Sequence, residues 1–95
     1  FLASTREGIR EGREYLTREL TAMGWKVWKS HTNFLYADSH LNTKVLAAEL
    51  EKKGLIIRGN FRYSRITVGT MEQNREMIGI IKATVAEGNV PPAQP

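Results

Sequence analysis

The chain has 95 residues, of which 41% are hydrophobic and 25% are charged. These are ordinary values for one globular domain, and they exclude a largely disordered chain. No apolar run approaches the roughly 20 residues of a membrane helix, and the first residues lack the pattern of a signal peptide. There are no cysteines, so disulfides and thiolate metal sites are excluded, and we expect a cytoplasmic protein. Because the chain is short for an enzyme and begins with Phe1, we expect a piece of a longer chain.

The net charge of +4 comes from residues 25–62, because the segments on either side carry equal numbers of basic and acidic residues. A basic middle could face nucleic acid or a small anion. The alternative is that these lysines and arginines are scattered over the surface and in contact with solvent. This interpretation fits because no basic run is longer than Lys52–Lys53.

The first predicted element is an amphipathic helix over residues 4–23. Ser4 and Glu7 have the spacing of a capping box at its start. Gly8 and Gly12 lower the helix propensity, and we expect them to let an element from outside this chain approach closely. The residues that share the apolar face are Ile9, Leu16, Leu20 and Met23.

Two strands are predicted next, over residues 25–29 and 33–37, and the second is apolar enough to be buried on both faces. A helix over residues 42–53 follows, with Asn42 as its N-cap and an i,i+4 ion pair between Glu49 and Lys53. Residues 55–58 and 64–68 are predicted to form two more strands, separated by turn chemistry at residues 59–60.

Thr70 and Gln73 predict a capping box for a last helix over residues 71–86. Residues 89–95 contain all three prolines and are expected to form a mobile tail, which leaves residues 1–88 as the domain. The order α-β-β-α-β-β-α favours an α+β fold. We expect a two-layer sandwich in which the helices cover one face of a three- to four-stranded sheet.

Two arginines are the candidate binding residues. Ile66 and Val68 point to one side of their strand, so Arg65 should point to the side that the helices leave free, and Arg58 ends the preceding apolar strand. An arginine within a strand is often a member of a cross-strand ion pair. The alternative is an anion site, because the guanidinium group matches carboxylate and phosphate in bidentate geometry.

The residues alone predict no catalytic or metal-binding constellation. His31 and His40 lie in predicted loops without carboxylates at ligand spacing. No lysine has a context that would desolvate it for Schiff-base formation.

Residues 54–58 (GLIIR), residues 64–70 (SRITVGT) and then Glu72 and Asn74 resemble the C-terminal part of histidinol-phosphate aminotransferase, a family of class I/II, fold-type I pyridoxal-phosphate enzymes. The resemblance covers about residues 5–83. It implies that Arg65 binds the substrate α-carboxylate and that Arg58 lies near the distal phosphate. Arg62, in a loop shorter than that of many relatives, could substitute for Arg58. Ser64 stands where the family usually has Leu.

The resemblance further implies that this chain is the small domain of a homodimeric parent enzyme of histidine biosynthesis. Pyridoxal phosphate and the Schiff-base lysine would belong to a large domain outside these residues, so the piece alone would be inactive and bind no cofactor. It implies neither a nucleic-acid nor a membrane partner. The rival interpretations are a free-standing module that binds nucleic acid or a small anion, and a catalytically dead relative that acts through protein contacts.

Overall fold

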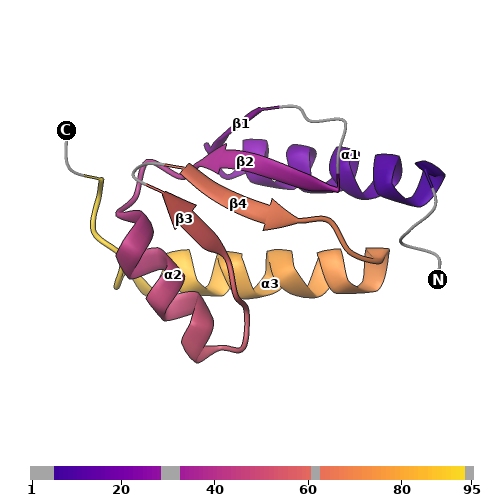
Figure 1. Ribbon diagram of the computed structural model, residues 1–95. Helices are drawn as coiled ribbons and strands as arrows, with labels where there is room; N and C mark the ends of the chain where they lie inside the picture. Colours follow the sequence, from indigo (N-terminus) through magenta and orange to yellow (C-terminus); the bar gives the residue numbers. More distant parts are fainter. Residues whose placement is uncertain (1–5, 29–32, 61–62, 94–95) are drawn as a thin grey trace.

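The computed structural model describes residues 6–28, 33–60 and 63–93, and its elements follow the predicted order α-β-β-α-β-β-α (Figure 1). The helices are α1 (Arg6–Ala22), α2 (Thr43–Lys52) and α3 (Met71–Glu87). The strands are β1 (Lys26–Trp28), β2 (Phe34–Asp38), β3 (Arg58–Asn60) and β4 (Tyr63–Thr67).

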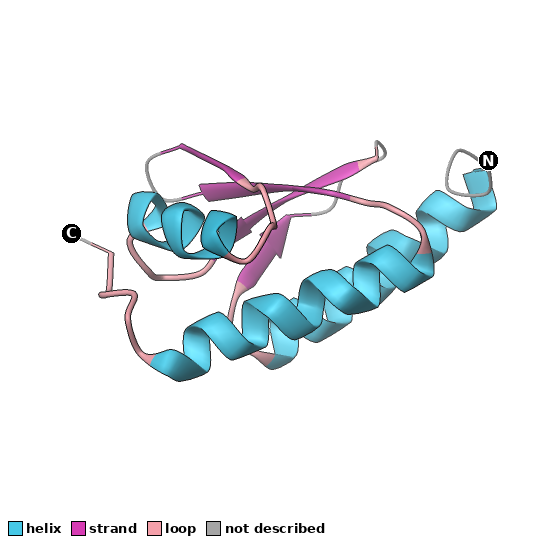
Figure 2. Ribbon diagram, turned by 90° about the horizontal axis from the view of Figure 1, so that it is seen from below, coloured by secondary structure: helices cyan, strands magenta, loops and turns pink. Residues whose placement is uncertain are grey.

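The predicted α+β, two-layer arrangement is confirmed. The strands form one antiparallel sheet in the order β1-β2-β4-β3, so β2 and β4 are the inner strands. Helices α1 and α3 pack on one face of this sheet, while α2 contacts α3 and the edge strand β3 (Figure 2). The other face carries no helix from the described ranges of the chain.

The core lies between the sheet and the helices. Leu16 and Leu20 of α1, Leu35 of β2, Ile66 of β4 and Ile81 of α3 are all at most 1% exposed. Burial of each such side chain contributes about 1.5–3 kcal/mol. The apolar face that the sequence predicts for α1 therefore packs on the sheet, with Ile9 and Met23 at its half-buried ends.

Two strand predictions need correction. Strand β2 is not buried on both faces, because Leu35 and Ala37 face the helices while Tyr36 is 43% exposed. Arg58 begins β3 rather than ending a strand over 55–58, and residues 59–60, expected as a turn, belong to this strand. Residues 55–57 instead form the connection that leaves α2, and the amide of Leu55 donates to the carbonyl of Leu50 (3.0 Å).

The helix caps agree with the sequence. The amide of Val45 donates to Oδ1 of Asn42 (3.1 Å), and Thr70 and Gln73 form a reciprocal capping box at the start of α3. The predicted capping box at Ser4 lies outside the described residues.

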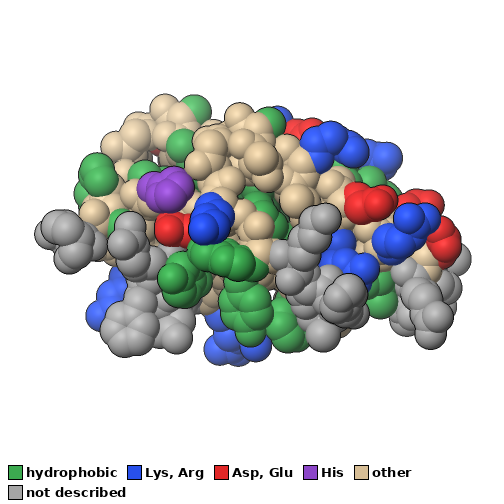
Figure 3. Space-filling model, turned by 90° about the horizontal axis from the view of Figure 1, so that it is seen from above, with side chains coloured by type: hydrophobic (Ala, Val, Ile, Leu, Met, Phe, Trp, Pro, Cys, Tyr) green, Lys and Arg blue, Asp and Glu red, His purple; other side chains and the backbone are tan. Residues whose placement is uncertain are grey.

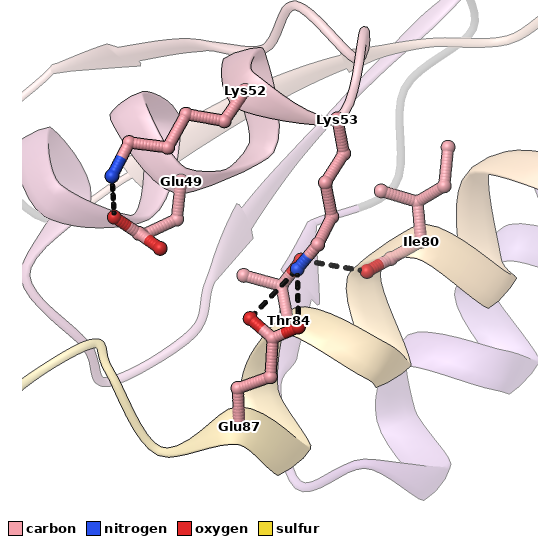
Figure 4. A network of polar contacts seen from close by, with 6 residues as sticks. All are labelled: Glu49, Lys52, Lys53, Ile80, Thr84 and Glu87. Carbon is pink, nitrogen blue, oxygen red and sulfur yellow. Dashed lines mark hydrogen bonds and ion pairs between the residues drawn. The ribbon is translucent and has the colours of Figure 1, made fainter.

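Lys53, the C-cap residue of α2, joins that helix to α3 (Figure 4). Its ammonium group donates to both carboxylate oxygens of Glu87 (2.7 and 2.8 Å) and to the hydroxyl of the buried Thr84 (3.2 Å). The predicted pair between Glu49 and Lys53 is therefore wrong, and Glu49 pairs with Lys52 at 2.8 Å. A carboxylate on a neighbouring packed helix, together with a buried hydroxyl, holds Lys53 away from its own helix.

The start of the C-terminal segment, expected to be mobile from residue 89, contacts the segment before α2. Val90 is buried, and Pro91 accepts a hydrogen bond from the amide of Asn42 (2.8 Å). The amide of Ala93 donates to the carbonyl of His40 (3.0 Å). These contacts connect residues 90–93 to the segment before α2, and residues 94–95 lie outside the described part.

At Gly12, helix α1 packs closely against another segment. That segment belongs to this chain and not, as expected from the sequence, to an element outside it. A Cβ at Gly12 would lie 2.5 Å from Cγ1 of Val68 and 2.8 Å from Nδ2 of Asn74. The absence of a side chain therefore lets α1 pack directly on the segment that follows β4.

We predict that Gly12→Ala lowers the free energy of unfolding by about 1–3 kcal/mol, because the added methyl overpacks this contact. The matched control is Gly79→Ala in α3, where an added Cβ meets no atom within 4 Å. That control should raise the free energy of unfolding by up to about 1 kcal/mol through helix propensity. Urea unfolding of the two variants measures both effects, and a Gly12→Ala variant as stable as the wild type would contradict the packing argument.

Candidate functional site

Arg65 stands at the centre of the uncovered sheet face. Its neighbours Ser64 and Ile66 are 2% and 0% exposed and point toward the helices, so Arg65 points the opposite way and is exposed. Arg65 pairs with Tyr36 of β2 on one side and with Arg58 of β3 on the other. The predicted outward direction of Arg65 is confirmed.

Arg58 and Arg65 therefore lie directly opposite each other on adjacent strands. Cross-strand partners have Cβ atoms roughly 4.5–5.5 Å apart, and like charges in this position destabilise a sheet. Neither guanidinium forms an ion pair with a carboxylate of the described residues. An anion with two or more oxygens would relieve this repulsion by accepting hydrogen bonds from both groups.

Aromatic rings lie beside Arg65. The guanidinium carbon of Arg65 lies 5.3 Å from the ring centroid of Phe34, which is in edge contact with Tyr36 at 5.6 Å. This ring gives Arg65 a cation–π contact that restricts the side chain without neutralising it. This aromatic support was not predicted from the sequence, although Phe34 and Tyr36, two residues apart on an alternating strand, share one face of the sheet.

A hollow of about 350 Å³ lies beside the arginines and is lined by Trp28, Tyr36 and Tyr63. The rings of Trp28 and Tyr63 meet edge to face at 4.9 Å, and Nζ of Lys26 lies 5.2 Å from the Trp28 ring. In a view from above, Figure 3 shows hydrophobic side chains next to lysine or arginine side chains, with acidic side chains also on this view. This surface combines flat apolar rings with positive charge.

The remaining sequence candidates do not add to this face. Ser64 is buried and points into the helix layer, away from the side of the sheet that carries the arginines. His40 is exposed in the loop before α2, with its Nδ1 3.7 Å from a carboxylate oxygen of Asp38. Arg62 and His31 lie outside the described residues.

The described part of the chain holds no group of three His, Asp or Glu side chains that could bind a metal ion. None of the helices described there is long and apolar enough to cross a membrane.

The described lysines do not fit the role of a Schiff-base former, which needs an uncharged amine. Lys52, Lys53 and Lys82 form ion pairs with glutamates at 2.7–2.9 Å. The hydrogen bond from Lys52 to Glu49 raises the pKa of Lys52, which is the wrong direction for a nucleophile. Lys26 and Lys44 are exposed.

Comparisons with known proteins place the chain in a family. The chain is 35% identical to histidinol-phosphate aminotransferase 2 of Psychrobacter arcticus over 95% of its own length and 26% of that relative. It is 38% identical to the histidinol-phosphate aminotransferase of Methanosarcina mazei over 82% of its length and 23% of that relative. The chain thus spans about a quarter of the curated relatives that it matches.

The fold is also found in a crystal structure of a provisionally assigned aminotransferase from Burkholderia pseudomallei. The TM-score is 0.70 at 19% identity, and the match covers 82% of this chain and 26% of that one. At this identity the likeness shows the fold alone. The family model for aminotransferases of class I and II matches residues 1–81, and the chain therefore belongs to the class I and II aminotransferase family.

Proposed function

We propose that this chain is the substrate-binding small domain of a pyridoxal-phosphate-dependent aminotransferase, most similar to histidinol-phosphate aminotransferase. The observation that supports it best is the cross-strand pair of Arg58 and Arg65, which no described carboxylate neutralises. In this role Arg65 binds the carboxylate of the amino acid. Arg58, one strand away, lies near the distal phosphate of a phosphorylated substrate.

Arg65 is suited to orient a substrate. It belongs to an inner strand that is paired on both sides, and the Phe34 ring restricts its guanidinium group. A bidentate grip on a carboxylate would fix the direction of the adjacent Cα–H bond for proton removal. Pyridoxal phosphate, held by the rest of the parent protein, supplies the electron sink of this chemistry. The present chain alone is expected to be inactive.

The partner of the uncovered sheet face would be the remainder of the parent protein. Exposed apolar patches on soluble proteins commonly mark interfaces, and this face carries the hollow lined by Trp28, Tyr36 and Tyr63. A large domain that covers the hollow would exclude water from the two arginines. Exclusion of water strengthens their attraction for an anion.

One observation favours a second candidate function, a free-standing module for single-stranded nucleic acid. Trp28, Tyr36 and Tyr63 could stack bases on an uncovered antiparallel sheet, beside the positive charges of Arg58 and Arg65. Affinity for an oligonucleotide that falls steeply with salt concentration would support this function. A parent protein with a second domain over this face would exclude it.

We predict that inorganic phosphate stabilises the isolated chain through the two arginines. Arg58→Gln should raise the free energy of unfolding by about 0.2–1 kcal/mol at low salt, because the like-charge contact is lost. The same change should reduce the gain in Tm that phosphate gives over chloride at equal ionic strength. Arg75→Gln, an exposed position in α3, is the control and should change neither value. Equal phosphate effects in wild type and both variants would contradict an anion site at Arg58.

The catalytic role is tested by replacing the matching C-terminal segment of the Psychrobacter arcticus relative with this chain. In an active graft, Arg65→Ala should raise the KM for the amino acid at least about tenfold, because a charge-assisted bidentate contact is lost. Arg75→Ala in the same graft should leave the KM unchanged. Steady-state kinetics measure both, and an unchanged KM in Arg65→Ala, or a folded, cofactor-loaded graft without activity, would refute the proposed function.

A further inference from the structure

Asn74, in the first turn of α3, is fully buried, and its side chain forms two hydrogen bonds with the backbone of Gly69. Its Oδ1 accepts a hydrogen bond from the amide of Gly69 (2.9 Å), and its Nδ2 donates to the carbonyl of the same residue (3.2 Å). Both polar groups of Gly69 are therefore satisfied by one side chain. We call this two-point contact the Asn74–Gly69 clamp.

Only an asparagine in this orientation completes the Asn74–Gly69 clamp. A flipped amide would place two donors and two acceptors face to face, and an aspartate would set a second carboxylate oxygen against the Gly69 carbonyl. Loss of the side chain would leave a buried N–H and a buried C=O without partners, which costs more than an exposed hydrogen bond. The clamp is thus chemically specific.

Helix α1 closes the clamp from the other side. Gly12 brings the α1 backbone against Val68 and Asn74, so closely that a Cβ at Gly12 would overlap both side chains. Gly69 is itself enclosed, since a Cβ there would collide with Oε1 of Gln73. The segment between β4 and α3 is therefore fixed by contacts from two helices.

The position of Arg65 in β4 explains why this fixation matters. Strand β3 pairs with β4 only as far as the partners Arg58 and Arg65, so Arg65 is the last residue of β4 with neighbours on both sides. Beyond it, β4 is paired with β2 alone, up to Thr67, and the Val68 amide donates to the Asn33 carbonyl (2.7 Å). On the β3 side, no strand among the described residues pairs with the end of β4.

We propose that Asn74 is a positioning residue for Arg65. Through the Asn74–Gly69 clamp, Asn74 holds the end of β4 that pairs with β2 alone. It thereby sets the placement of the Arg65 guanidinium group relative to Arg58. This inference rests on the proposed anion-binding role of Arg65. It adds a residue that never contacts the ligand but controls how well the two arginines converge on it.

The experiment is a titration of the isotopically labelled chain with inorganic phosphate, followed by NMR at the Nε–H groups of Arg58 and Arg65. Asn74→Ala should raise the phosphate Kd at least about threefold, the scale of effects that act through a neighbouring residue. Thr70→Ala is the matched control, because it removes the hydroxyl that caps the same helix and keeps both groups of the Asn74–Gly69 clamp. It should lower stability while the phosphate Kd stays within about 1.5-fold of wild type.

A second measurement needs no ligand. Backbone relaxation should show increased motion at residues 65–69 in Asn74→Ala and wild-type order in Thr70→Ala. Equal weakening of phosphate binding in both variants, or unchanged order at residues 65–69 in Asn74→Ala, would overturn the inference. If Asn74→Ala does not fold, Asn74→Asp takes its place, because it retains the acceptor for the Gly69 amide. If wild type binds no phosphate, the proposed function fails, and the relaxation data still decide the role of Asn74.

Discussion

The structure depends on the register of β4 between its two neighbours. Arg65 stands opposite Tyr36 on one side and Arg58 on the other, with Ser64 and Ile66 turned to the helices. A slip of one residue would turn Arg65 into the core and expose Ile66, so burial of the helix-facing side specifies this register strongly. The hydrophobic core therefore places the arginines, although it does not touch them.

The sequence predicts what depends on local pattern. Alternation around Ile66 placed Arg65 on the uncovered face, and the spacing of Thr70 and Gln73 predicted the cap of α3. Partners set by tertiary packing could not be predicted. The contact of Trp28 with Tyr63 depends on the strand order, in which β2 lies between β1 and β4. The pairing of Lys53 with Glu87 depends on the packing of α2 against α3. Local pairing rules instead assigned Lys53 to Glu49.

The opposed arginines are a local cost that the rest of the domain offsets. Like charges at cross-strand positions destabilise by less than about 1 kcal/mol, whereas each buried Leu or Ile of the helix-facing core contributes about 1.5–3 kcal/mol. The link from Lys53 to Glu87 and Thr84 adds a partly buried contact between α2 and α3, far from the uncovered face. Local inconsistencies of this kind are typical of functional sites, where binding rather than folding selects the residues.

The geometry of the arginines also bears on which ligand suits them. Side chains at directly opposed strand positions start roughly 4.5–5.5 Å apart and lie on the same face of the sheet. That arrangement suits a small anionic ligand that lies within reach of both guanidinium groups. A nucleic-acid strand presents its phosphates in succession, and a platform for it gains from basic groups spread along the rings rather than paired at one spot. The pairing of Arg58 with Arg65 thus favours a small carboxylate or phosphate over a nucleic-acid strand.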